Sequence, residues 1–388
     1  MNTTRDSSGH PCHICNGMLQ PLDGFETLVQ VTSDCRPWRT GGTLAVCSRC
    51  GAVQKPATPA WLQEANEIYA HYDIYSQGGG AEQTAFDAGG ASAARSSKIV
   101  EWLRVAGELP ATGTMLDIGC GNGAFLRAFS QCYPDWELAG LELSDRNRKT
   151  IEAIPGVTQL HIGTLAEVDQ HFDLIVLIHA LEHIPDPVAY LRSLTGHLNP
   201  GGRLLIEVPD LTSSPFDILI ADHTTHFTAA VLPRVITAAG FTVQSLESGF
   251  IPKELSLLAQ YCGDLTEAKI VTDQQTCDKD SDGGNNAAAH IAWLQSLVAQ
   301  ARAEKQDCGI FGTSISATWL AASLGDQVRF FIDEDTNRIG RSHMGRPIFS
   351  PADTPKGSTI LVPLRADIAR AVARRFNQLE CQFVLPPA

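Results

Sequence analysis

The stretch Met115-Leu-Asp-Ile-Gly-Cys-Gly-Asn-Gly123 decides the fold of the central part of this 388-residue chain. Its apolar first half predicts a buried strand, and Gly119, Gly121 and Gly123, at every second position, predict a tight turn. Residues 124–129, Ala-Phe-Leu-Arg-Ala-Phe, then predict a helix. A strand, a glycine turn and a helix open the α/β units that bind nucleotides, because glycine lets a ligand lie against the backbone. We therefore expect an α/β nucleotide-binding domain around this turn.

Two carboxylates narrow the choice of ligand. Asp117 precedes the turn, where it would repel a pyrophosphate at the following helix N-terminus and suits a cationic or amine-bearing ligand better. Residues 136–142, Trp-Glu-Leu-Ala-Gly-Leu-Glu, predict a second buried strand that ends in Glu142. An acidic residue at this place accepts hydrogen bonds from ribose hydroxyls in dinucleotide sites.

The stretch 116–123 together with Glu142 resembles the cofactor site of class I S-adenosylmethionine-dependent methyltransferases. The resemblance implies that the three glycines lie against the amino-acid part of the cofactor, that Glu142 binds the ribose, and that Asp117 helps to fix the methionyl amino group. The segments 161–165, 172–187 and 198–209 resemble the third, fourth and fifth strand ends of the family, in the right order. We expect cofactor contacts from Leu165, near the adenine, and from His179.

Four cysteines near the N-terminus predict a metal site. Cys12 and Cys15 form one Cys-x-x-Cys pair, Cys47 and Cys50 form another, and 31 residues separate the pairs. Each pair aims two thiolates at one point, and two such pairs complete a tetrahedral zinc site with no open catalytic position. His10, His13 and Cys35 are rival ligands. We expect a structural zinc ribbon.

A histidine is the natural general base for methyl transfer, because its pKa lies near neutrality. Four histidines are expected beyond the carboxyl ends of the strands, where an acceptor binds in α/β sheets. His179 and His183 flank the fourth strand end, and His223 and His226 precede an expected helix over 229–239. We favour His223 for the chemistry and His226 for support. Tyr75, beside a run of three glycines, is a further candidate.

The C-terminal third repeats the strand, glycine turn and helix around Gly312, with acidic residues at 333–335 after the next strand. The combination of a four-cysteine ribbon, a central methyltransferase and a small α/β tail resembles the sugar C-methyltransferases. That family implies a nucleotide-linked sugar as acceptor, with Tyr75 and either His183 or His223 beside it. Asp-His-Thr-Thr-His at 222–226 departs from the family's His-Glu-His type of loop, so both carbon and oxygen methylation stay open.

The expected fold is α/β, with a Rossmann-like methyltransferase domain between a zinc ribbon and a smaller Rossmann-like C-terminal domain. The expected segments are a zinc ribbon (1–60), a helical and aromatic linker able to act as a lid (61–107), the methyltransferase domain (108–250), a linker and helix (251–305), and the small α/β domain (306–388).

Composition bounds the functions that fit. The formal charge of −14 disfavours a nucleic-acid surface, and no apolar run is long enough to cross a membrane. No signal-peptide pattern is visible, so we expect a cytoplasmic protein whose eleven cysteines bind metal or pack in cores. The predicted function is methylation of a small molecule, with a nucleotide-activated or glycan-linked sugar as acceptor. The alternatives are an RNA methyltransferase with basic ribbon residues and a non-catalytic cofactor-binding scaffold; the basic residues are Arg36, Arg39, Arg49 and Lys55.

Overall fold

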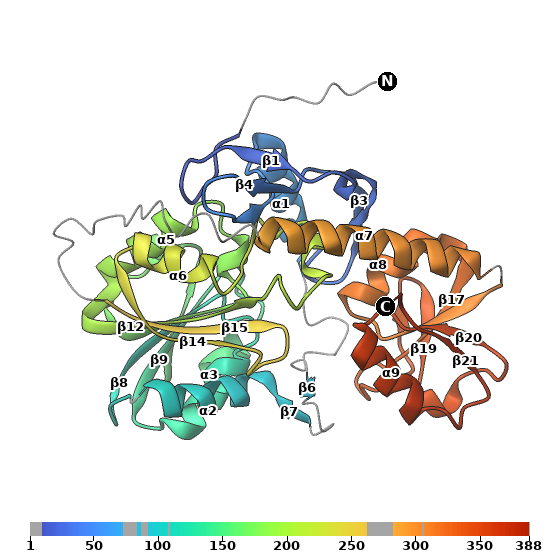
Figure 1. Ribbon diagram of the computed structural model, residues 1–388. Coiled ribbons are helices and arrows are strands. Elements are labelled where there is room, and N and C mark those ends of the chain that lie inside the picture. Colours follow the sequence, from blue (N-terminus) through green and yellow to red (C-terminus); the bar gives the residue numbers. More distant parts are fainter. Residues whose placement is uncertain are drawn as a thin grey trace.

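The computed structural model describes residues 10–72, 84–86, 92–107, 109–261, 282–304 and 306–387. An N-terminal module lies above a large α/β domain, a smaller α/β unit lies to the right of that domain, and one long helix, α7, runs from the module to the smaller unit (Figure 1). Among the described residues, no helix is both long enough and apolar enough to cross a membrane.

The large domain is built on a seven-stranded sheet in the order β10-β9-β8-β11-β12-β15-β14. Its strands are β8 (Gly113–Ile118), β9 (Trp136–Glu142), β10 (Val157–Ile162), β11 (Phe172–Ile178), β12 (Leu198–Pro209), β14 (Phe241–Ser248) and β15 (Glu254–Tyr261). The five strands β10, β9, β8, β11 and β12 run parallel to one another, and β15 is antiparallel to both of its neighbours, β12 and β14. The strand order reverses between β8 and β11, which is where α/β sheets bind ligands at the carboxyl ends of their strands. The expected Rossmann-like sheet is confirmed.

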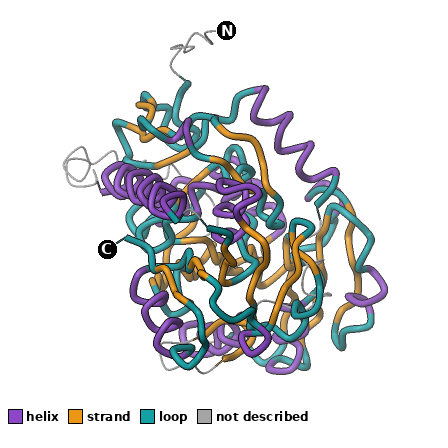
Figure 2. Tube along the Cα trace, turned by 90° about the vertical axis from the view of Figure 1, so that its right-hand side faces the viewer, coloured by secondary structure: helices purple, strands orange, loops and turns teal. Residues whose placement is uncertain are grey.

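Helices cover both faces of this sheet, and the alternation of buried side chains along its strands explains why. In β8, Met115 packs with α2 (Arg95–Gly107), α3 (Ala124–Cys132) and α4 (Arg148–Glu152), whereas Leu116 packs on the opposite face with α5 (Pro187–Leu194) and α6 (Val231–Ala238). Figure 2 shows the helices around the strands from a second direction. Because both faces are covered, the central strands β8 and β11 have mostly buried side chains on both sides, as in other parallel sheets.

The expected domain boundary at residue 250 lies inside a β-hairpin. Strands β14 and β15 pair antiparallel on either side of it, so the sheet continues to Tyr261. The helix expected over 229–239 begins at Val231, whose backbone amide donates to Thr228 Oγ1 at 3.2 Å. The helix therefore starts two residues later than expected, with Ala230 as its N-cap, and Thr228 accepts hydrogen bonds two residues before that cap.

The N-terminal module shares a sheet with the large domain. It contains β1 (Leu19–Pro21), the hairpin of β2 (Val29–Val31) and β3 (Pro37–Thr40), β4 (Ala45–Cys47), β5 (Val53–Gln54) and helix α1 (Pro59–Ala70). The sheet order is β1-β4-β5-β13, and β13 (Thr225–His226) comes from the segment of the large domain that carries two predicted catalytic histidines. The module therefore contacts the predicted site directly.

The smaller unit has a six-stranded sheet in the order β18-β19-β17-β16-β20-β21. Its strands are β16 (Cys308–Phe311), β17 (Val328–Ile332), β18 (Ser342–His343), β19 (Arg346–Phe349), β20 (Thr359–Leu361) and β21 (Gln382–Val384), and its helices are α8 (Ile315–Leu324) and α9 (Ala366–Arg375). This agrees with the expected second α/β unit.

Helix α7 (Asp282–Ala303) starts within the segment 263–285, for which the sequence predicts an exposed loop. Residues 262–281 lie outside the described residues, but 282–285 are helical. The loop prediction rested on the polar composition of this segment, including Asp-Lys-Asp-Ser-Asp-Gly-Gly-Asn-Asn at 278–286. The structure gives the two glycines another role, because a Cβ at Gly283 would lie 2.6 Å from the carbonyl oxygen of Gly51. The glycines let α7 pack closely against the N-terminal module.

Candidate functional site

The glycine turn after β8 has the backbone geometry that only glycine adopts at low cost. Gly119, Gly121 and Gly123 have φ of 73°, 59° and 77°, all in the left-handed region. The amide of Gly119 donates to the carbonyl of Leu141 at 2.8 Å, so the turn is tied to the end of β9. A Cβ at Gly123 would lie 2.7 Å from Ile154 Cδ1. The turn is thus fixed both by its conformation and by its packing.

Glu142 at the end of β9 is held against this turn by two backbone amides. Gly121 N donates to Oε1 at 2.7 Å and Leu143 N donates to Oε2 at 2.9 Å. Burial raises the pKa of the Glu142 carboxyl, and these two amide hydrogen bonds oppose the shift. An ionised carboxylate has about four acceptor positions, so two remain for other donors such as a pair of ribose hydroxyls.

Asp117 lies in β8, two residues before Gly119, and is buried, with 2% of its surface exposed. Burial, with a further contribution from Glu142, raises the pKa of Asp117 to about 8. A cationic group placed beside it would lower that pKa again, because opposite charges favour the ionised form. Together, a buried carboxylate for an ammonium group, a carboxylate for a ribose and an open glycine turn fit S-adenosylmethionine chemically.

The other two predicted cofactor residues have different surroundings. Leu165 follows β10 at the start of a short 3-10 helix and is half-buried against the core. His179 follows β11; its Nδ1 lies 3.2 Å from Glu182 Oε1, and its Nε2 lies 3.3 Å from Glu254 Oε1. Burial lowers the pKa of His179, but Glu254 and Glu182 outweigh it and raise that pKa to about 10. Both cofactor contacts stay predictions.

The segment 217–228, here called the histidine loop, holds two histidines on one carboxylate. His223 Nδ1 lies 2.8 Å from Asp217 Oδ1, and His226 Nδ1 lies 2.6 Å from Asp217 Oδ2. Asp217 is buried, yet the two imidazoles hold its pKa well below the ordinary value. When each Nδ1 carries the donated hydrogen, the Nε2 of a neutral His223 is a free proton acceptor.

His183 lies beside His223 and has its own carboxylate. Its Nδ1 lies 3.0 Å from the carbonyl oxygen of Asp222 and 3.3 Å from Asp222 Oδ2. Burial lowers the pKa of His183, but Asp222 outweighs burial and the pKa is raised overall. The rings of His183 and His223 are perpendicular, with centroids 4.6 Å apart. The structure therefore brings these two predicted bases together.

His226 differs from the other two histidines in being fully buried. It has no exposed surface, and within the described part of the chain its Nε2 has no hydrogen-bond partner. Burial lowers its pKa, although Asp217 opposes the shift. A side chain so enclosed suits the supporting role that the sequence analysis assigned to it.

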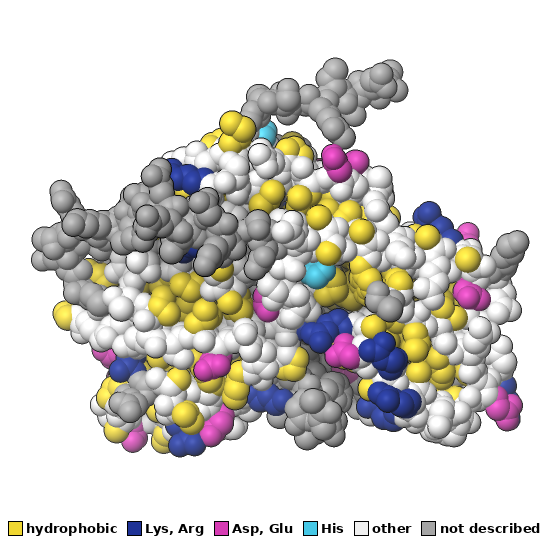
Figure 3. Space-filling model, in the orientation of Figure 1, with side chains coloured by type: hydrophobic (Ala, Val, Ile, Leu, Met, Phe, Trp, Pro, Cys, Tyr) yellow, Lys and Arg dark blue, Asp and Glu magenta, His cyan; other side chains and the backbone are white. Residues whose placement is uncertain are grey.

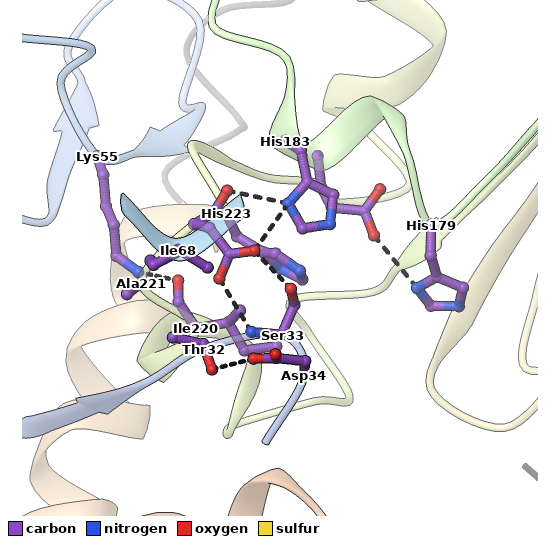
Figure 4. Close-up of polar contacts among 12 residues, drawn as sticks. Thr32, Ser33, Asp34, Lys55, Ile68, His179, His183, Ile220, Ala221 and His223 are labelled. Atoms are coloured by element: carbon purple, nitrogen blue, oxygen red, sulfur yellow. Dashed lines mark hydrogen bonds and ion pairs between the residues drawn. The ribbon is translucent and has the colours of Figure 1, made fainter. Parts of the chain in front are cut away.

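The N-terminal module holds the histidine loop in place. Ser33, in the β2–β3 turn, donates from its backbone amide to Asp222 Oδ1 at 2.9 Å and from its hydroxyl to Oδ2 at 2.5 Å. Lys55 Nζ donates to the carbonyl of Ile220, and Trp61 Nε1 donates to that of Ala221 at 3.0 Å. Figure 4 shows Ser33 and Lys55 from the module reaching the part of the loop that His183 contacts. The site is thus assembled from two regions of the chain.

These supporting residues were missed by sequence reasoning. Asp217 carried one usable signal, a carboxylate six residues before His223, but Ser33 carried none because 189 residues separate it from Asp222. Tyr75 lies outside the described residues. Another tyrosine, Tyr69 of α1, packs its ring edge-on to His183 at a centroid distance of 6.1 Å.

The four predicted zinc ligands converge in the N-terminal module. The Sγ atoms of Cys12 and Cys50 are 3.7 Å apart, and those of Cys15 and Cys47 are 3.5 Å apart. Tetrahedral zinc with bonds of about 2.3 Å places its sulfurs about 3.8 Å apart, so the spacing fits. A Cβ at Gly17 would lie 2.8 Å from Cys47 Sγ, so the knuckle requires glycine there.

Hydrogen bonds to sulfur support the same interpretation. Gln54 Nε2 donates to Cys12 Sγ at 3.1 Å, and the backbone amide of Arg49 approaches Cys47 Sγ at 3.4 Å. Such donors stabilise thiolates over thiols. Of the rival ligands, His13 bonds through Nε2 to Thr225 Oγ1 at 2.7 Å instead. The four-cysteine cluster is compatible with a zinc ribbon.

Comparison with known proteins identifies the large domain. Residues 93–246 match a family described as "methyltransferase domain". The dTDP-4-amino-2,3,4,6-tetradeoxy-D-glucose N,N-dimethyltransferase of Saccharopolyspora spinosa is 34% identical over 122 residues, which are 30% of this chain and 47% of that protein. The ubiquinone biosynthesis O-methyltransferase of Bordetella avium is 27% identical over 174 residues, 42% of this chain and 67% of that protein. The chain thus spans about half the length of the first of these relatives and two thirds of the second.

Solved structures also resemble part of the chain. The amino pentose methyltransferase CalS10 from Micromonospora echinaspora is 19% identical, with a TM-score of 0.33, over 42% of this chain and 89% of that one.

Proposed function

We propose that this chain, whose residues 93–246 form a class I S-adenosylmethionine-dependent methyltransferase domain, transfers the methyl group of that cofactor to a small molecule, a nucleotide-activated or glycan-linked sugar. The observation that carries the proposal is a juxtaposition. Asp117 lies near the end of β8, and Glu142 ends the neighbouring strand β9. His183 follows β11, across the point where the strand order reverses, and His223 follows β12 with its ring against that of His183. The donor residues and the candidate bases therefore share one side of the sheet.

The cofactor supplies a methyl group on a positively charged sulfur, so the protein mainly has to bind it and hold the acceptor in line. In this proposal Asp117 accepts hydrogen bonds from the methionyl ammonium group, and Glu142 binds the ribose hydroxyls. Gly119, Gly121 and Gly123 leave room for the amino-acid portion against the backbone. Leu165 and His179 complete the predicted contacts.

His223 is the proposed general base. Its Nδ1 is occupied by Asp217 at 2.8 Å, which orients the ring and leaves Nε2 to accept a proton from the acceptor. Asp217 would also stabilise the imidazolium that forms. His183 is the second candidate and Tyr75 the third, while His226 shares Asp217 and supports His223.

The choice of a sugar rests on two supports. The Saccharopolyspora relative is named as a methyltransferase of a dTDP-linked amino sugar, and its methylated atom is a nitrogen. On one face of the molecule, Lys and Arg side chains gather near the boundary between the large domain and the smaller unit (Figure 3). A nucleotide carries negative phosphates, which such side chains attract. Carbon, oxygen and nitrogen acceptors all remain compatible with this proposal.

We further propose that the four cysteines bind zinc as a structural ion. Four thiolates fill the coordination sphere, so this ion takes no part in the transfer. Its role would be to stabilise the module that holds the histidine loop. Metal analysis of the purified chain tests this: zinc is expected, and its loss is expected in Cys47→Ser.

The deciding experiment measures transfer of labelled methyl groups to a panel of sugar nucleotides. Labelled product with one acceptor, reduced at least 100-fold in His223→Ala with cofactor affinity kept, is the expected result; the loss of a general base costs about this much. Full activity of His223→Ala would move the base to His183 or Tyr75. Binding of S-adenosylhomocysteine without transfer to any acceptor, including RNA, would favour the scaffold alternative.

The RNA methyltransferase alternative has less support in the structure. Arg36 is paired with Asp34 at 2.8 Å, and Arg39 is paired with Glu64 and Glu67. Lys55 is buried with 3% of its surface exposed. Side chains neutralised or buried in this way contribute little to phosphate binding. A complex with RNA that persists at low salt and dissociates as salt rises would revive this alternative.

A further inference from the structure

Three side chains beside the proposed acceptor position form a donor set for a metal ion distinct from the cysteine cluster. They are Glu182, His183 and His223, and one ligand atom from each lies within 4.8 Å of the others. The side chains of Glu182 and His223 are buried, with 1% and 4% of their surfaces exposed, and that of His183 is 13% exposed. Two imidazoles and one carboxylate are a common ligand set for divalent first-row metals, and they leave coordination positions open.

Each of the three proposed ligand side chains is oriented by a hydrogen bond to a further residue. His183 Nδ1 bonds to Asp222, and His223 Nδ1 bonds to Asp217 at 2.8 Å. Both Nε2 atoms are therefore left to face the ion in the unprotonated form. Glu182 Oε1 is held by His179 Nδ1 at 3.2 Å. Protein ligands of metals characteristically have such outer partners, which fix the tautomer and the direction of the ring.

An independent observation points to a missing cation. Glu182 Oε2 is buried, and it has no hydrogen-bond partner in the described part of the chain. A buried carboxylate oxygen without a partner is costly, and natural proteins usually satisfy such groups with a donor, a water or an ion. The surroundings favour a positive charge, because Asp217 and Asp222 lie directly behind the two histidines.

A second arrangement, Asp217 with His223 and His226, is also compact but does not offer a metal site. Its nitrogen–oxygen distances of 2.8 and 2.6 Å are direct hydrogen bonds that already use both carboxylate oxygens. An ion bound between these atoms at 2.0–2.1 Å from each would hold them about 3.4 Å apart, which is farther than the distances observed. Asp217 therefore acts as the outer partner and not as a ligand.

We propose that Glu182, His183 and His223 bind one divalent first-row transition-metal ion, with the two imidazole Nε2 atoms and Glu182 Oε2 as ligands. The three groups close by small side-chain rotations when the ion enters. An acceptor hydroxyl on an open position of the ion would lose its proton more easily than a free one. With the ion bound, the ion and not His223 would favour loss of the acceptor's proton, whereas without it His223 keeps its proposed role as base.

The test is metal content of the full chain, with Zn²⁺ as probe, after equilibration and removal of free ion. The expected result is two ions per chain, one at the cysteines and one at this site. Glu182→Gln and His183→Ala should each retain only the cysteine-bound ion, and Asp217→Asn should weaken the second site about 10- to 100-fold. Co²⁺ added to protein that holds zinc at the cysteines alone should give a spectrum without thiolate charge-transfer bands, since its ligands are nitrogen and oxygen.

The matched control is His171→Ala, which removes an exposed histidine just before β11 and should leave two ions bound. One ion per wild-type chain at saturating Zn²⁺ overturns the proposal, as does retention of two ions in Glu182→Gln. Retained S-adenosylhomocysteine binding checks that each variant is folded. The measurement needs no acceptor, so the metal site can stand if methyl transfer is never detected, and the proposed function can stand if only one ion binds.

Discussion

The two α/β units contain the same local motif in different chemical settings. In the large domain the glycine turn faces Asp117 and Glu142, and among the residues that the structure describes neither carboxylate has an ion-pair partner. In the smaller unit the turn at Gly312 is followed by Thr313, which donates to Asp333 Oδ2 at 2.6 Å and accepts from Arg338 Nη1 at 2.7 Å.

Arg338 makes the difference between the two turns. Its side chain lies 3.7 Å from Asp333 and 3.4 Å from Asp335, so the acidic residues of the smaller unit already have a cation within the chain. In our proposal, Asp117 is left for a cation from outside the chain and Glu142 for hydroxyl donors. A strand, a glycine turn and a following acidic residue therefore do not define a ligand site unless those acids are unpaired, and the smaller unit fits a packing role.

Removing one acidic residue from each unit tests most directly whether the two turns differ in ligand binding. Asp117→Ala should weaken binding of S-adenosylhomocysteine about 1,000-fold, because it leaves the ligand's ammonium group without its buried partner. Asp333→Ala, the matched change in the smaller unit, should leave that affinity unchanged. Calorimetric titration checks both. Equal losses in the two variants would mean that both turns bind the ligand.

The two glycine turns should also differ in their tolerance of a methyl group. Gly123→Ala combines a left-handed backbone with a Cβ that would lie 2.7 Å from Ile154, so we expect a loss of about 3 kcal/mol in the free energy of unfolding. Gly312→Ala has the same backbone strain, with φ of 88°, but nothing within 4 Å of its Cβ, so about 1 kcal/mol is expected. Urea unfolding of both variants measures the gap, and equal losses would show that packing at Gly123 relaxes.

Removing the internal cation tests the other side of the comparison. Arg338→Ala removes the cation beside Asp333 and the donor to Thr313 Oγ1, in a site where the arginine side chain is 13% exposed. We expect the smaller unit to lose about 2 kcal/mol, less than for a fully buried pair. The control is Arg341→Ala on the exposed surface, which should change the unfolding free energy little. Similar effects of the two variants would remove Arg338 from the explanation.

Buried histidines of the two regions should respond to pH with opposite signs. Burial, reinforced by Arg338 and Arg346, lowers the pKa of His343 to about 4, so its unfolded form takes up a proton between pH 6.5 and 4 while the folded form does not. The contribution of His343 to the free energy of unfolding therefore decreases as pH falls, by about 1 kcal/mol between pH 6 and pH 5.

His179 in the large domain has its pKa raised to about 10, so its contribution is present below pH 6.5 and is lost as pH rises toward 10. His343→Gln should flatten the acid side of the stability curve, and His179→Gln the alkaline side. Unfolding free energies measured from pH 5 to pH 9 check this. A change on the same side of the curve in both variants would contradict the assigned environments.

Local pattern was sufficient for the elements that carry the cofactor residues. The apolar run before Gly119 is β8, the expected strand over 136–142 is β9, and the helix expected over 124–129 is the first part of α3. These elements follow from the alternation of side chains along strands and helices and from the glycine conformations, which neighbouring residues set. The Cys-x-x-Cys pairs are local in the same way, because each knuckle needs only four residues.

Long-range contacts decided the rest of the site. Sequence spacing placed His183, His223 and His226 near the acceptor, but it could not show that β13 pairs with β5 of the N-terminal module or that Ser33 holds Asp222. Nor could it show that Glu182 would have a buried oxygen without a partner. Each of these depends on segments that are far apart in the chain and close in space.

The sequence by itself determined the α/β architecture, the glycine turn with its two carboxylates and the four-cysteine cluster, because backbone conformation and side-chain periodicity are properties of short segments. Only the tertiary structure decided which carboxylates are paired, which histidines share Asp217 and which face each other. The physical reason is that charge state and hydrogen bonding depend on burial, and burial is set by whichever distant segments exclude water from a side chain.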